Sequence, residues 1–210
     1  MMEVRTISDV FSDPDKFRAA ALAQNFDSYW EHASSSYSPQ PWGGTWAGLR
    51  SKPLIELFNA QHNKELTDSI IAYIDPPVCS GYTVESYLQF NSAFDPETPE
   101  TNGVHQISTE ADYVAVINLT PDSITPRAET HFYDPSSSFS KHRPFSTEDN
   151  FTHRETVTHA YNSLTVFDPA EFIKESRSIG ETVEGSVLSL VFLLKTHNST
   201  SMPSGFKKLT

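Results

Sequence analysis

Three features that mark particular protein classes are scarce in this chain of 210 residues. Cys79 is the only cysteine, which rules out an intramolecular disulfide and argues against a cysteine-based zinc cluster. Lys and Arg number 15 against 27 Asp and Glu, and the net charge of −12 argues against nucleic acid or an anionic membrane as a partner. No apolar run approaches the roughly 20 residues of a membrane span. We therefore expect a reducing compartment such as the cytoplasm, or a particle assembled in one.

Local motifs of several enzyme classes are also missing. The sequence holds no Gly-x-Ser-x-Gly elbow, no Gly-rich phosphate loop and no His-Glu-x-x-His zinc motif. Cys79 lies between Val78 and Ser80 and is interpreted as a buried small hydrophobe rather than a nucleophile. Serine-hydrolase, P-loop and zinc-peptidase chemistry therefore have no support in the sequence.

Aromatic residues and prolines are plentiful, with 14 Phe, 8 Tyr and 14 Pro, a composition typical of a β-rich fold with many turns. Apolar periodicity predicts helices over 14–24, from 52 onwards and over 64–74. It predicts strands over 4–10, 81–90, 113–119, 128–133, 156–160, 164–167 and 187–194. The stretches 27–48, 92–103 and 134–152 are interpreted as loops.

Helices precede strands in this order, which favours the α+β fold class. We expect a single domain over 1–210, with a helical N-terminal part at 1–80, a β core at 81–195 and a polar tail at 196–210. The expected main body is a β sandwich or jelly roll. His105 lies shortly before the apolar strand 113–119, a place where several β-barrel enzymes hold a metal ligand.

Several segments, taken in order, resemble one family. They lie at 11–22, 46–51, 87–90, 113–121, 130–133 and 161–168 and include Trp46-Ala-Gly-Leu-Arg-Ser51, Tyr87-Leu-Gln-Phe90 and Tyr161-Asn-Ser-Leu-Thr-Val-Phe-Asp168. Together they are similar to the iron(II)- and 2-oxoglutarate-dependent oxygenases, in the prolyl-hydroxylase-like branch found in phages and marine bacteria. The resemblance implies a double-stranded β-helix (jelly-roll) core with N-terminal helices packed on one sheet.

The resemblance also implies a site that this sequence mostly lacks. The family holds iron with two histidines and one carboxylate, and pairs 2-oxoglutarate with an arginine or lysine. His105 matches the first ligand, but Ile107 stands where the carboxylate belongs and Ile173 where the distal histidine belongs. Ser186 stands where the family has its arginine. The resemblance therefore implies a degenerate metal site.

Two functions follow from this interpretation. The first is a non-catalytic pseudoenzyme with no cofactor, a structural or interaction protein that binds other protein subunits. A phage virion or accessory component, located in the virion or the host cytoplasm, is its concrete form, with 92–103 and 134–152 as candidate contact segments. The alternative is an active iron(II)/2-oxoglutarate dioxygenase with a rearranged site. Because Glu129 and His131 share one face of a predicted strand, they could complete a metal site with His105.

Overall fold

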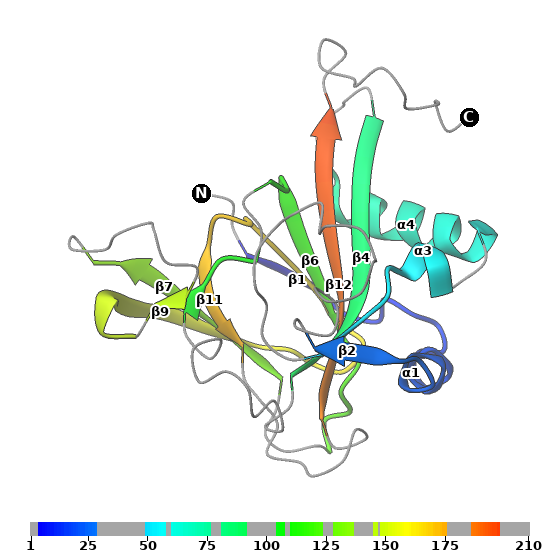
Figure 1. Cartoon of the computed structure of the whole chain (residues 1–210), viewed down its shortest axis with the longest axis horizontal. Helices are drawn as coiled ribbons and strands as arrows, with labels where there is room; N and C mark the ends of the chain where they lie inside the picture. The colour runs from blue at the N-terminus through cyan, green and yellow to red at the C-terminus, as the bar shows by residue number, and fades with distance from the viewer. Residues whose placement is uncertain are drawn as a thin grey trace.

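The computed structural model describes residues 4–28, 49–57, 60–76, 81–91, 104–107, 110–123, 128–136, 145–146, 148–175 and 186–197. The chain is mainly β, and its strands form two antiparallel sheets with helices packed on one of them (Figure 1). None of the described helices is both long and apolar enough to cross a membrane.

The large sheet has seven strands. In order across the sheet they are β1 (Arg5–Ile7), β10 (Leu164–Phe167), β6 (Tyr113–Asn118), β12 (Val187–His197), β4 (Gly81–Asn91), β3 (Leu49–Ser51) and β2 (Phe26–Ser28). The small sheet has five strands, in the order β8 (Phe145–Ser146), β5 (Val104–His105), β11 (Phe172–Glu175), β7 (Glu129–Pro135) and β9 (Phe151–Thr158). A 3-10 helix, η2 (Glu148–Asn150), leads into β9.

From β4 onwards the chain passes back and forth between the two sheets. β4, β6, β10 and β12 belong to the large sheet, whereas β5, β7, β9 and β11 belong to the small one. Of the described strands from β4 to β12, leaving out the two-residue β8, only β7 and β9 follow each other within one sheet. This alternation places segments far apart in sequence side by side.

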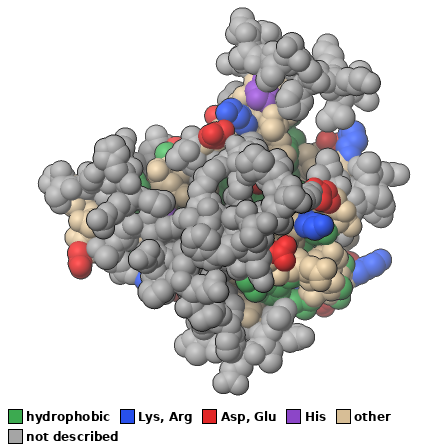
Figure 2. All heavy atoms as spheres, in the orientation of Figure 1, with side chains coloured by type: hydrophobic (Ala, Val, Ile, Leu, Met, Phe, Trp, Pro, Cys, Tyr) green, Lys and Arg blue, Asp and Glu red, His purple; other side chains and the backbone are tan. Residues whose placement is uncertain are grey.

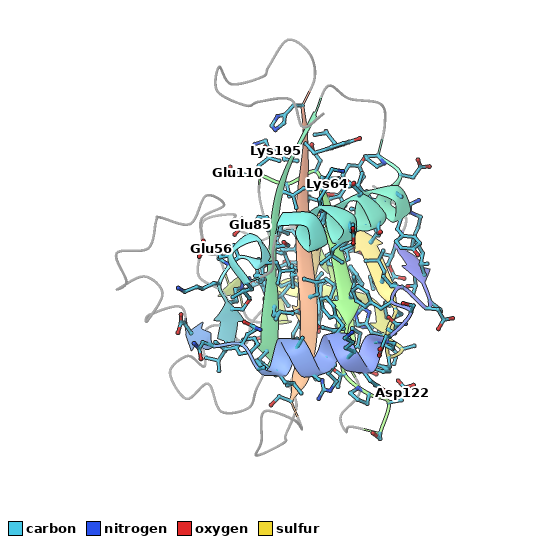
Figure 3. The ribbon with its side chains drawn as sticks, turned by 90° about the vertical axis from the view of Figure 1, so that its right-hand side faces the viewer. Glu56, Lys64, Glu85, Glu110, Asp122 and Lys195 are labelled. Carbon is cyan, nitrogen blue, oxygen red and sulfur yellow. The ribbon has the colours of Figure 1, made fainter. Side chains whose placement is uncertain are left out.

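The helices cover the outer face of the large sheet, with α1 (Pro14–Leu22) and α4 (Ala60–Ile74) crossing its strands and α3 (Leu54–Leu57) beside β4 (Figure 3). Helix α1 begins where the sequence indicates, because Asp13 Oδ1 accepts a hydrogen bond from the Lys16 backbone N–H at 3.1 Å and Pro14 fits the first turn.

Both faces of the large sheet are buried, and each face packs into its own core. Residues that alternate along β12 show this: Leu190 and Phe192 pack in the outer core against the helices, whereas Val191 and Leu193 pack in the inner core between the sheets. The run Val187–Leu194 is buried throughout, as an unbroken apolar strand with two covered faces requires.

Most predicted elements are confirmed, with shifted ends. The strand at 164–167 has the predicted bounds, but only Arg5–Ile7 of the predicted 4–10 is strand. The loops predicted over 27–48 and 134–152 were partly wrong, since strands β2, β7, β8 and β9 reach into them. The N-terminal part is likewise not helical alone, because it adds three strands to the large sheet. Most of 27–48, all three tryptophans, Cys79 and the segment 198–210 lie outside the described residues.

Asn162 fastens the N-terminal segment to the turn before β10. Its side-chain oxygen accepts from the Phe11 backbone N–H and its side-chain nitrogen donates to the Phe11 carbonyl, each at 2.9 Å. Its φ of 60° lies in the left-handed region, which asparagine tolerates better than most residues. Both the side chain and the backbone preference therefore favour asparagine here.

We expect Asn162→Ala to destabilise the fold by about 3 kcal/mol, about 1 from each lost hydrogen bond and about 1 from an alanine at positive φ. Asn162→Gly is the matched control, because it loses the same hydrogen bonds but tolerates the backbone angle. Urea denaturation measures both. The glycine variant should be the more stable of the two, and equal losses would contradict the role of the backbone angle.

Candidate functional site

His105 faces the interior between the two sheets. It lies directly opposite Ile173 on the neighbouring strand β11, and Ile173 lies opposite Phe132 on β7. Directly opposed residues of antiparallel strands point to the same face. Phe132 and Ile173 are buried in the inner core, so the half-buried His105 belongs to the same inward-facing row.

Aliphatic side chains occupy the two positions where the family resemblance places further metal ligands. Ile173 is 0% exposed, and Ile107 is partly buried and packs against the inner core. The buried members of that core are apolar residues from both sheets together with Ala111, namely Tyr87, Ala111, Val114, Val116, Phe132, Phe167, Ile173, Val191 and Leu193. His105 is therefore the one potential ligand among the three matched positions.

Glu129 and His131 share a face, as their spacing predicts, but it is the opposite face from that of His105. They alternate along β7 with Thr130 and Phe132, which are buried, and their own side chains are 34% and 28% exposed. His131 Nε2 lies 3.8 Å from Glu129 Oε2, and its Nδ1 lies 2.9 Å from the Thr156 hydroxyl. The register thus does not bring Glu129 and His131 together with His105.

Ser186 is buried immediately before β12 begins. A serine hydroxyl carries no positive charge, so it offers no ion pair to a dicarboxylate such as 2-oxoglutarate. Within the described part of the chain, no three His, Cys, Asp or Glu side chains are grouped so that they could hold a metal ion.

His159 is a second histidine of the interior, and both of its ring nitrogens have partners. Nε2 lies 2.8 Å from the Thr130 hydroxyl of the small sheet, and Nδ1 lies 2.9 Å from the Thr165 hydroxyl of the large sheet. Burial lowers the pKa of His159 to about 4, because the charged imidazolium is poorly solvated there. The neutral ring therefore acts as a polar link between the two sheets.

The sequence did not predict a polar cluster at the inner side of β3 and β4. Arg50 Nε donates to Gln89 Oε1 at 3.1 Å, and Gln89 Nε2 donates to Glu175 Oε2 of the small sheet at 2.8 Å. The Arg50 guanidinium carbon lies 4.0 Å from the centre of the Tyr87 ring, in cation–π geometry. The sequence signal was Glu85 and Gln89, four positions apart on one face of β4 with Tyr87 between them. Local alternation does not indicate whether that face is internal.

Burial shifts the ionisation of this cluster. It lowers the pKa of Arg50 and raises those of Glu85 and Tyr87, because each charged form loses solvation. The Arg50 charge opposes the shift of Glu85 and Tyr87. The Tyr87 hydroxyl consequently stays protonated at neutral pH.

The solved structures that resemble this chain include two weak likenesses. No family model and no curated protein sequence matches the chain. E. coli ycfD matches with a TM-score of 0.44 and 12% identity over 94% of this chain and 50% of that chain, so this chain spans half its length. The Fe(II)/α-ketoglutarate-dependent dioxygenase TqaL matches with a TM-score of 0.40 and 12% identity over 93% of this chain and 91% of that chain. At these TM-scores neither likeness identifies a family.

We expect the stability of the protein to fall as the pH drops from about 6.5 towards about 4, partly through His159. The unfolded chain binds a proton near the ordinary pKa of 6.5, whereas the folded chain does not until about 4, so acid favours unfolding in this window. The full shift corresponds to about 3 kcal/mol. Urea denaturation across this range should show a shallower pH slope for His159→Gln than for the unaltered chain.

The exposed His153 provides the control for this measurement. His153→Gln removes a histidine without touching the interior and should keep the original slope. Identical slopes for the unaltered chain and His159→Gln would contradict the assignment of His159 as a neutral buried group.

Proposed function

We propose that the chain is a double-stranded β-helix. The support is the order of eight strands, β4, β5, β6, β7, β9, β10, β11 and β12. The first pairs with the eighth, the second with the seventh, the third with the sixth and the fourth with the fifth, which is the nesting of a jelly roll. The resemblance to the 2-oxoglutarate oxygenases implies this same core.

On this fold we propose a non-catalytic role, as a structural or interaction protein. The observation that carries the proposal is the pair Ile107 and Ile173, which pack with the inner core on the side of the sheet that His105 faces. Aliphatic side chains have no atoms that coordinate a metal. A jelly-roll scaffold keeps its stability without a metal, and its function then resides in surfaces grafted on the fold.

The residues at this position do not fit an iron ion and 2-oxoglutarate. One imidazole is far short of the two histidines and one carboxylate that non-haem iron requires. The missing positive charge at Ser186 removes the partner that the family provides for the cosubstrate carboxylate. We therefore propose that neither group is a cofactor of this chain.

The partners proposed are other protein subunits, as in a phage virion or an accessory component of the host cytoplasm. The net charge of −12 disfavours nucleic acid and anionic membranes. On the face shown in Figure 2, the described Lys and Arg side chains are scattered and form no continuous basic patch. The phage setting rests on the sequence resemblance alone.

The metal prediction is tested by anaerobic titration of the purified chain with Mn(II) or Fe(II) in the presence of 2-oxoglutarate. We expect no stoichiometric binding at micromolar metal, because His105 has no further ligand among the matched positions. Isothermal calorimetry and the electron paramagnetic resonance signal of free Mn(II) both report it. Stoichiometric micromolar binding would refute the non-catalytic proposal.

A positive control is available in the same chain. The double variant Ile107→Asp, Ile173→His restores ligand types at both positions and should gain Mn(II) affinity if the three positions converge. Adding His105→Ala to that variant should abolish the gain. Thermal denaturation of each variant verifies that it is folded before titration, since both isoleucines are core residues.

A further inference from the structure

The inner side of β4 carries polar groups beside the apolar inner core. Glu85, Tyr87 and Gln89 occupy alternate positions and lie opposite Leu193, Val191 and Ser189 of β12. Leu193 and Val191 belong to the inner core, so the three β4 side chains face the interior as well. Arg50 and Glu175 complete the cluster from β3 and β11 through hydrogen bonds of 3.1 Å and 2.8 Å to Gln89.

Two polar atoms of this cluster are buried without a hydrogen-bond partner in the described structure. They are Glu85 Oε2 and the Tyr87 hydroxyl, and Tyr87 is only 4% exposed. Positions two apart on a strand lie about 7 Å from each other, close enough for one small group to reach both side chains. A buried polar atom without a partner loses its solvation with no compensating hydrogen bond, so the pair is a candidate for contact with a ligand.

The chemistry of the two atoms selects the ligand. Glu85 supplies an acceptor, and a hydroxyl oxygen such as that of Tyr87 also accepts. The cluster holds one positive side chain, Arg50, against two carboxylates, Glu85 and Glu175, and Arg50 already lies over the Tyr87 ring and donates to Gln89. An excess of negative charge with an unfilled acceptor favours a cationic donor over an anion.

We propose that Glu85 and Tyr87 form the end of a binding site for a primary ammonium group. Glu85 Oε2 and the Tyr87 hydroxyl oxygen accept two of its three N–H donors. Glu85 as a whole residue is only partly buried, although its Oε2 atom is buried. The proposed ammonium site does not depend on whether the chain binds a metal, because neither Glu85 nor Tyr87 stands at a position where the family has a metal ligand.

The test uses n-butylammonium chloride, titrated into the full chain at constant ionic strength and followed by backbone amide NMR shifts. Butan-1-ol and sodium butyrate are neutral and anionic probes of the same length. We expect saturable shifts along β4 with n-butylammonium and weaker or no binding of the other two. Equal binding of butan-1-ol, or no saturable shift with n-butylammonium, would overturn the proposal.

Two variants test whether Glu85 and Tyr87 hold the ammonium group. Glu85→Gln should weaken n-butylammonium binding by about tenfold or more, since it removes a charge-assisted hydrogen bond. Tyr87→Phe should weaken it by a smaller factor. Glu56→Gln is the matched control, because Glu56 is an exposed acid on helix α3 and its loss makes the same change in net charge (Figure 3). Unchanged affinity of Glu85→Gln for n-butylammonium would refute the site. If that variant does not fold, the binding of the three probes to the unaltered chain still tests the proposal.

A second arm separates two sources of the ammonium group. Nα-acetyl-lysine amide carries the same alkylammonium as a lysine side chain of a protein partner. Tighter binding of this compound than of n-butylammonium would assign the site to a partner's lysine, and weaker binding would assign it to a free amine. A chain that binds neither probe has no ammonium site.

Discussion

Burial of both faces of the large sheet is the constraint on which the rest of the structure depends. Its central strands, β6 and β12, are apolar at successive positions, so neither face can be left to water. The helices cover one face and the small sheet covers the other, which produces an outer and an inner core. His105 therefore faces a packed apolar interior. The resemblance implies a polar metal centre at this place instead.

Polar groups inside that interior fall into two kinds. His159 has a hydroxyl partner on each ring nitrogen and links the sheets as a neutral group. Asn118 likewise donates to the carbonyls of Thr120 and His159 and accepts from the Thr120 backbone N–H. Glu85 and Tyr87 differ, because each keeps one buried polar atom unpaired within the described residues. Buried polar groups with hydrogen-bond partners stabilise the interior, whereas a buried polar atom without a partner requires a further explanation.

Long apolar or capped elements could be predicted from the sequence, and short or polar ones could not. β10 and β12 are apolar runs and α1 is capped, which are strong local signals. β11 is short and partly polar, β5 and β8 have two residues each, and only the end of the mostly polar edge strand β9 was predicted. Alternation correctly placed Glu129 and His131 on one face, but which face they occupy depends on pairing with β9 and β11. Arg50 and Glu175 meet Gln89 through long-range pairing that no local pattern reveals.

The central claim is that aliphatic side chains fill the position that a metal would occupy. A crystal structure of the chain grown anaerobically with Mn(II) and 2-oxoglutarate tests it most directly, because manganese is identified by its anomalous scattering. The account predicts Ile107 and Ile173 packed against the inner core and no anomalous peak beside His105. An anomalous peak within coordination distance of the His105 ring, about 2.0–2.2 Å by analogy with other first-row metals, would contradict it.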